Sequence, residues 1–196
     1  MLLPNQLTVL RIILTPVFVY FFLADGDYHL EISIVIYIVA ALTDWYDGWL
    51  ARKFNYITAW GKFWDPMADK ILTSAAFLCF VILDIIPLWM VLLIVLRDLF
   101  VTTVRGYVDY KNLNFPTSTY AKVKTFIQMI FLYYLLVFYT LSVSQFSGEN
   151  VKSISFLMLN EHFIYYIMLL ITIITVHSGY VYIKQNYDLI LKAVKE

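Results

Sequence analysis

The chain has 196 residues, of which 62% are hydrophobic and 14% are charged, and its formal net charge is zero. Soluble domains are about half apolar, so this composition argues against a soluble globular protein and for one built in lipid. With no basic tail and no excess of positive charge, we expect no nucleic-acid partner. Cys79 is the single cysteine, which excludes an intrachain disulfide or thiolate metal site, and we expect it to be buried. No polar linker divides the sequence, so residues 1–196 are expected to form one domain.

Six segments are apolar and long enough to cross the hydrocarbon layer of a bilayer, which takes roughly 20 residues as a helix. Because such runs satisfy their backbone polar groups in lipid only as helices, the sequence predicts an all-α integral membrane protein with six transmembrane helices. The expected segments are Leu7–Leu23, His29–Leu50, Asp65–Leu83, Leu88–Tyr107, Tyr120–Leu141 and Phe163–Ile183. The first segment has neither a preceding basic region nor a small-residue cleavage site, so we expect it to be retained in the protein.

An even number of spans places both termini on the same side of the membrane. All Lys and Arg residues except Lys152 fall on that side, whereas acidic residues dominate the opposite loops. The positive-inside rule therefore predicts that both termini are cytoplasmic. The turn between the second and third spans lies on this side too.

Four carboxylates border that turn: Asp44 and Asp47 before it, Asp65 and Asp69 after it. Residues three or four apart share a helical face, so each pair is expected to point in one direction. Ionised side chains at membrane depth are costly, and four together call for a cation or a reaction. Oxygen ligands without a nearby His or Cys suit Mg²⁺ or Mn²⁺, and four carboxylates are enough for two such ions.

Small residues and one arginine accompany these carboxylates. Gly48 and Gly61 remove side chains where a phosphate-bearing ligand could approach the backbone, although glycines also serve close packing of membrane helices. Ala51 shares the face of Asp44, and Arg52 offers a planar fork suited to phosphate. The interpretation we favour is a catalytic metal site at the cytoplasmic end of the helices.

The complete pattern is Asp-x-x-Asp-Gly-x-x-Ala-Arg, eight residues, then Gly-x-x-x-Asp-x-x-x-Asp, and it resembles the signature of the CDP-alcohol phosphotransferases. Every position of the signature is matched, and the length and expected topology fit the family as well. The resemblance implies transfer of a phosphatidyl group from a CDP-linked lipid to an alcohol, with release of CMP. It also implies a homodimer, and it suggests a bacterial cell (inner) membrane as the location.

The resemblance also implies roles for individual residues. Asp44, Asp47, Asp65 and Asp69 would hold the metal ions on the diphosphate, and Asp69 would be the general base for the attacking hydroxyl. The remaining signature positions would contact the CDP-lipid; they are Gly48, Ala51, Arg52 and Gly61.

Two further stretches, Leu96–Tyr107 and Ser118–Met129, resemble the bacterial branch of the family that makes phosphatidylglycerophosphate from CDP-diacylglycerol and sn-glycerol 3-phosphate. Ala121 departs from that branch, which usually has glycine there. The basic residues of these stretches are the candidates for binding the acceptor phosphate, namely Arg105, Lys124, Lys122 and Arg97. Arg97 lies roughly 12 Å deeper along its helix than Arg105, where an arginine usually faces a polar cavity or a partner charge. Asp98, its neighbour in sequence, is expected to face elsewhere.

Other functions remain open at this stage. The same chemistry could serve another acceptor, such as an inositol phosphate, serine or phosphatidylglycerol. A membrane prenyltransferase also uses aspartates and Mg²⁺, but normally in two separated clusters. A carboxylate-based ion transporter would place its carboxylates near the bilayer midplane with access to both sides.

Overall fold

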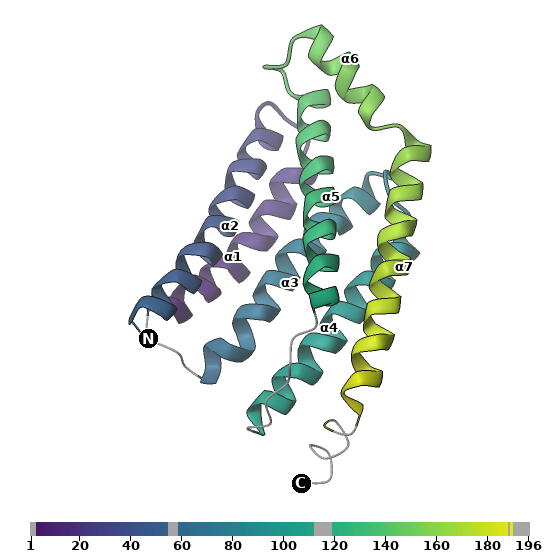
Figure 1. Ribbon diagram of the computed structural model, residues 1–196. Coiled ribbons are helices and arrows are strands. Elements are labelled where there is room, and N and C mark those ends of the chain that lie inside the picture. The colour runs from purple at the N-terminus through teal and green to yellow at the C-terminus, as the bar shows by residue number, and fades with distance from the viewer. Residues whose placement is uncertain (1–2, 55–58, 112–118, 188, 190–196) are drawn as a thin grey trace.

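Helices form wherever the sequence carries long apolar runs, and they are arranged as an up-and-down bundle (Figure 1). The helices are α1 (Leu3–Leu23), α2 (His29–Phe54), α3 (Ala59–Ile82), α4 (Leu88–Tyr110), α5 (Thr119–Val143), α6 (Glu149–Met158) and α7 (Glu161–Gln185). The computed structural model describes residues 3–54, 59–111, 119–187 and 189, and these ranges contain no strand. Within the helices, the side chains of residues 3–5, 44, 45, 47–52, 54, 59–63, 109 and 110 lie outside the described set.

The expected all-helical fold is thus confirmed for the described residues, with differences at the ends of helices. α2 continues past Leu50 to Phe54, and α3 begins at Ala59, before the expected start at Asp65. The extension of α2 carries Ala51 and Arg52 of the motif, and the extension of α3 carries Gly61, so these positions are helical although they lay outside the expected spans. The short helix α6 was not expected; it follows α5 and leads into α7 at the end of the bundle opposite the motif (Figure 1).

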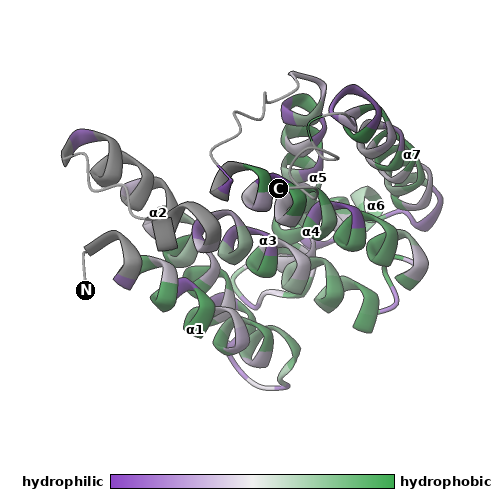
Figure 2. Ribbon diagram, turned by 90° about the horizontal axis from the view of Figure 1, so that it is seen from below, coloured by the Kyte–Doolittle hydropathy of each residue, from purple (hydrophilic) through white to green (hydrophobic). Residues whose placement is uncertain are grey.

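Hydrophobic residues dominate the described helices, on outward as well as inward faces (Figure 2). α1, α5 and α7 each contain a stretch long and apolar enough to cross a membrane, and α2 contains a shorter apolar stretch, His29–Thr43. Several hydroxyls in these helices donate to carbonyls of their own helix, as Thr140 does to Leu136 O at 2.7 Å. Such bonds satisfy polar side chains where no water is available. The described chain is therefore suited to a bilayer, while a count of six spans stays a prediction.

The hydrophobic core lies where α1, α2 and α3 pack together and extends to α4, α5 and α7. Phe18 and Tyr37 meet in it with ring centroids 5.2 Å apart, and Phe80 and Leu132 are fully buried beside them. Cys79 is buried in the same cluster, as expected. This core holds the helices in fixed register, so the polar ends that extend from it are positioned by apolar packing.

Candidate active site

The signature occupies the last turns of α2 and the first turns of α3, at one end of the bundle (Figure 1). That end also holds the beginning of α1, the end of α4, the beginning of α5 and the end of α7. Five signature residues belong to α2 and three to α3, all in helical backbone. For six of them the side chains lie outside the described residues, namely Asp44, Asp47, Gly48, Ala51, Arg52 and Gly61. Their expected roles therefore stay predictions.

Asp65 is the best-defined carboxylate of the motif. It is half-buried on α3, and the hydroxyl of Thr8, on α1, donates a hydrogen bond to its Oδ1. Arg11 lies one turn further along α1, fully buried, and attracts the Asp65 carboxylate electrostatically. α1 packs along α3, which brings these residues together across 57 positions of sequence. A hydroxyl donor thus orients the Asp65 carboxylate, and a buried cation lies near it.

Asp69 follows Asp65 by one helical turn and is also half-buried. Its backbone carbonyl accepts a hydrogen bond from Thr73 Oγ1 at 3.0 Å. The buried Tyr37 of α2 lies near enough to interact electrostatically with the Asp69 carboxylate. Asp65 and Asp69 therefore present two oxygen-donor groups from neighbouring turns of one helix, beside α1 and α2.

The described side chains fit part of a divalent cation site. Among them, no three His, Cys, Asp or Glu residues come together as a metal-binding group. Asp65 and Asp69 supply two carboxylates of the predicted set, and the other two, Asp44 and Asp47, lie outside the described side chains. The donors are all hard oxygens, and the Thr8 hydroxyl orients one of them in the way that outer ligand partners do. The residues present fit Mg²⁺ or Mn²⁺.

Thr8 and Arg11 are the residues that sequence reasoning missed. Arg11 was counted only among the cytoplasmic positive charges, and Thr8 was not considered. A usable signal existed, because a threonine and an arginine three apart in an apolar helix share one face. The sequence alone does not show which helix packs against that face, and the structure shows that it is α3.

A second charged cluster joins α4, α5 and α7. Lys124 Nζ of α5 donates to both carboxylate oxygens of Asp98, at 2.6 and 2.8 Å, and both side chains are almost completely buried. Arg97 donates from NH1 to Asp98 Oδ1 and from NH2 to Ser178 Oγ of α7, both at 2.9 Å. Lys70 of α3 adds a longer-range attraction to Asp98.

The expectation that Asp98 faces away from Arg97 was wrong. Helical spacing does separate the Cβ directions of adjacent residues, but a long arginine side chain can turn back across its own helix. Arg97 NH1 reaches Asp98 Oδ1 in this way. The predicted acceptor residues Arg97 and Lys124 thus meet at one carboxylate, and Asp98 belongs to their cluster.

The other two predicted acceptor residues, Arg105 and Lys122, are exposed. Arg105 lies two turns after Arg97 on α4, and Lys122 lies near the start of α5. Neither takes part in the described hydrogen bonds of the Arg97–Asp98–Lys124 cluster. The four predicted acceptor residues therefore fall into one pair that binds Asp98, with Lys124 buried and Arg97 partly buried, and one exposed pair.

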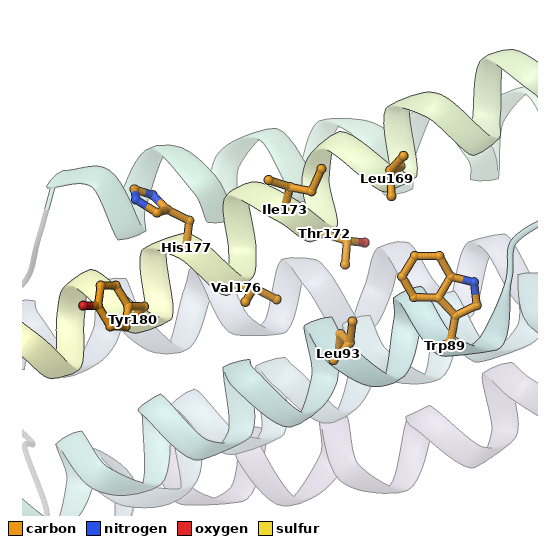
Figure 3. Close-up of a pocket in the computed structure, with 8 residues that line it drawn as sticks. All are labelled: Trp89, Leu93, Leu169, Thr172, Ile173, Val176, His177 and Tyr180. Atoms are coloured by element: carbon orange, nitrogen blue, oxygen red, sulfur yellow. The ribbon is translucent and has the colours of Figure 1, made fainter.

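A separate groove of about 430 Å³ lies between α4 and α7 (Figure 3). Trp89, Leu93 and Ile173 are among its lining residues, with His177 and Tyr180 toward one end. The Nδ1 of His177 lies 3.1 Å from the Tyr120 hydroxyl, within hydrogen-bonding distance. No carboxylate lines the groove, so it does not supply the chemistry expected of the motif.

Comparison with known proteins relates the chain to one family. The family model described as CDP-alcohol phosphatidyltransferase matches residues 1–177. A relative from Rickettsia felis, CDP-diacylglycerol--glycerol-3-phosphate 3-phosphatidyltransferase, is 33% identical over 182 residues, 93% of each chain. The protein of the same name from Bacillus subtilis is 38% identical over 147 residues, covering 69% of this chain and 76% of its own.

Proposed function

Because the chain belongs to the CDP-alcohol phosphatidyltransferase family, we propose that it transfers the phosphatidyl group of CDP-diacylglycerol to sn-glycerol 3-phosphate. The products are phosphatidylglycerophosphate and CMP. The observation that carries the proposal is the signature itself, complete at every position and set at the ends of two consecutive helices at one end of the bundle. The names of the relatives supply the acceptor.

Asp44, Asp47, Asp65 and Asp69 hold two divalent cations, Mg²⁺ or Mn²⁺, in this proposal. When bound, these ions would neutralise the diphosphate and the negative charge that develops on the departing CMP. The protein contributes the carboxylates, and the Thr8 hydroxyl orients Asp65 by donating a hydrogen bond to it, with the Arg11 charge nearby. Gly48, Ala51, Arg52 and Gly61 contact the CDP-lipid.

Asp69 is the proposed general base. Its carboxylate takes the proton of the acceptor hydroxyl as that oxygen attacks the phosphorus of the phosphatidyl group. A new P–O bond forms, the P–O bond to the CMP phosphate breaks, and the proton later passes from Asp69 to solvent. The half-buried position of Asp69, beside Asp65 on α3, is compatible with a base that must reach both substrate and water.

The acceptor phosphate is bound by the cations of α4 and α5. Arg97, Asp98 and Lys124 together carry one net positive charge in a largely buried setting. A buried charge is costly without a partner, and a phosphate supplies one. Arg105 and Lys122, which are exposed, attract the acceptor toward this cluster from the surface.

We place the protein in the bacterial inner membrane, with six spans, both termini in the cytoplasm and the active site facing the cytoplasm. This follows from the apolar helices, the charge distribution and the bacterial relatives.

The topology can be tested by labelling a single thiol. Cys79 is buried, so a Gly148→Cys variant carries one accessible thiol at the end opposite the motif. A membrane-impermeant maleimide should label it from outside spheroplasts. A homodimer is expected from the family, and light scattering of the detergent-solubilised protein measures it.

The test of the function is CMP release by the purified protein with CDP-diacylglycerol and Mg²⁺. Glycerol 3-phosphate, inositol 1-phosphate, serine, phosphatidylglycerol and no acceptor are compared. Release with glycerol 3-phosphate alone is the expected result. Release with another acceptor would support the chemistry proposed for the motif but show that the acceptor is not glycerol 3-phosphate. No release from folded protein with any acceptor would overturn the proposal.

A further inference from the structure

We infer that Ser178 and Gly179 of α7 are positioning residues that hold the Arg97 guanidinium in the orientation that receives the acceptor phosphate. The inference rests on the proposed function and assigns a task to the last long helix, which carries none of the signature. α7 packs against both α4 and α5, so it is placed to act on the residues of both.

Gly179 provides the space that the stem of Arg97 occupies. A Cβ built on Gly179 would lie 2.9 Å from Arg97 Cγ and 3.1 Å from its Nε. Carbon atoms do not approach so closely, so any side chain at this position must displace the middle of the arginine. Gly179 is helical and needs no unusual backbone conformation, which leaves this close approach as the reason for glycine here.

Ser178 holds one terminal nitrogen of the same guanidinium. Its Oγ accepts from Arg97 NH2 at 2.9 Å, and its own hydroxyl donates to Thr175 O at 2.8 Å. Because the hydroxyl proton is directed at the Thr175 carbonyl, the oxygen lone pairs are left for the arginine. Ser178 is 1% exposed, so no bulk water competes for this bond.

Asp98 holds the other terminal nitrogen, NH1, and is itself held by Lys124 of α5. Two contacts on opposite nitrogens fix the plane of a guanidinium, so three helices together determine how Arg97 is oriented. Each terminal nitrogen has two N–H donors, and one on each is used by the protein. The remaining pair suits two oxygens of a phosphate monoester, the geometry that arginine uses for bidentate phosphate recognition.

The experiment compares Gly179→Ala with Gly148→Ala in the full-length protein. Both variants add one methyl group to a glycine, but a Cβ at Gly148 meets no atom within 4 Å. We expect Gly179→Ala to raise the KM for glycerol 3-phosphate by roughly tenfold or more, as loss of a hydrogen bond to a charged group would. The KM for CDP-diacylglycerol and the melting temperature in detergent should change little, and Gly148→Ala should match the wild type throughout.

A double-mutant cycle with Arg97→Ala tests whether Gly179 acts through the arginine. If it does, Gly179→Ala has no further effect on the acceptor KM in the Arg97→Ala background. Additive effects would overturn the inference, as would a Gly179→Ala variant with wild-type acceptor KM.

The cycle also separates this inference from the proposed function. An Arg97→Ala variant with unchanged acceptor KM would remove the acceptor role of Arg97, and the positioning role with it. A raised KM in Arg97→Ala together with a normal KM in Gly179→Ala would overturn the positioning role alone. If Gly179→Ala raises both KM values and lowers the melting temperature, the glycine serves packing and the inference fails.

Discussion

Two charged regions of this bundle differ in the sign of their charge: carboxylates predominate in one and basic side chains in the other. Around α3, Asp65 and Asp69 belong to a set of four carboxylates, and the described support consists of the Thr8 hydroxyl and the Arg11 charge. Between α4, α5 and α7, the buried Lys124 and the partly buried Arg97 both bind the carboxylate of Asp98. The first region is suited to bind cations and the second to bind an anion.

The two regions are also connected. Lys70 is adjacent to Asp69 on α3 and attracts Asp98 on α4. A reaction that joins an anionic acceptor to a metal-bound diphosphate needs both kinds of site within one active site. In the proposed function, the α3 region carries out the bond-making chemistry, whereas the α4–α5–α7 region binds the acceptor. Variants in the first should therefore lower kcat, and variants in the second should raise the acceptor KM.

Metal removal is expected to have the largest effect and to act on the α3 region alone. Stripping divalent cations with EDTA should lower CMP release by at least about 1000-fold, because uncompensated charge on the diphosphate blocks displacement. Excess Mg²⁺ or Mn²⁺ should restore the rate. Full activity in EDTA, with metal content checked by atomic absorption, would contradict a metal role for the carboxylates.

Asp69→Asn should follow, with kcat lowered by roughly 10²–10⁴-fold, the range for loss of a general base. The acceptor KM should stay within a fewfold of the wild type. Asp84→Asn is the matched control, since Asp84 is exposed at the other end of α3 and its φ of 56° is one that asparagine also adopts. Wild-type kcat in Asp69→Asn would remove this residue as the base.

The two regions differ in how far the sequence could predict them. The α2–α3 motif is contiguous, so the sequence could place its residues near the facing ends of two consecutive helices, although both helices extend beyond the expected bounds. The partners of Asp65 come from α1, and helical periodicity says nothing about which helices touch. For the same reason Lys124 was predicted only as an acceptor-phosphate residue, while its contact with Asp98 depends on where α4 and α5 lie relative to each other.

The α4–α5–α7 region should show its largest effect in stability. Asp98→Asn leaves the buried Lys124 ammonium without its counter-charge, a change that costs about 3–5 kcal/mol in comparable buried pairs. Thermal unfolding in detergent measures this, with Asp27→Asn as the control because Asp27 is exposed at the opposite end. Adding Lys124→Met to Asp98→Asn should recover much of the stability but not the acceptor KM. If Asp98→Asn melts like the wild type, the pair is not a structural link between α4 and α5.

The smallest effect is expected from Thr8→Val, which keeps the shape of the side chain and removes the hydrogen bond to Asp65. A hydrogen bond to a charged group contributes about 1.5–3 kcal/mol to the stabilisation of that group. In the Thr8→Val variant, a bound cation that lies closer to the Asp65 carboxylate would compensate for part of this loss. We therefore expect the Mg²⁺ concentration for half-maximal activity to rise several-fold, with kcat at saturating Mg²⁺ nearly unchanged. Thr140→Val is the control, since its hydroxyl bonds only within α5. A fall in kcat that excess Mg²⁺ does not correct would mean that Thr8 contributes to the reaction itself, so that the α3 region extends onto α1 as chemistry and not only as support.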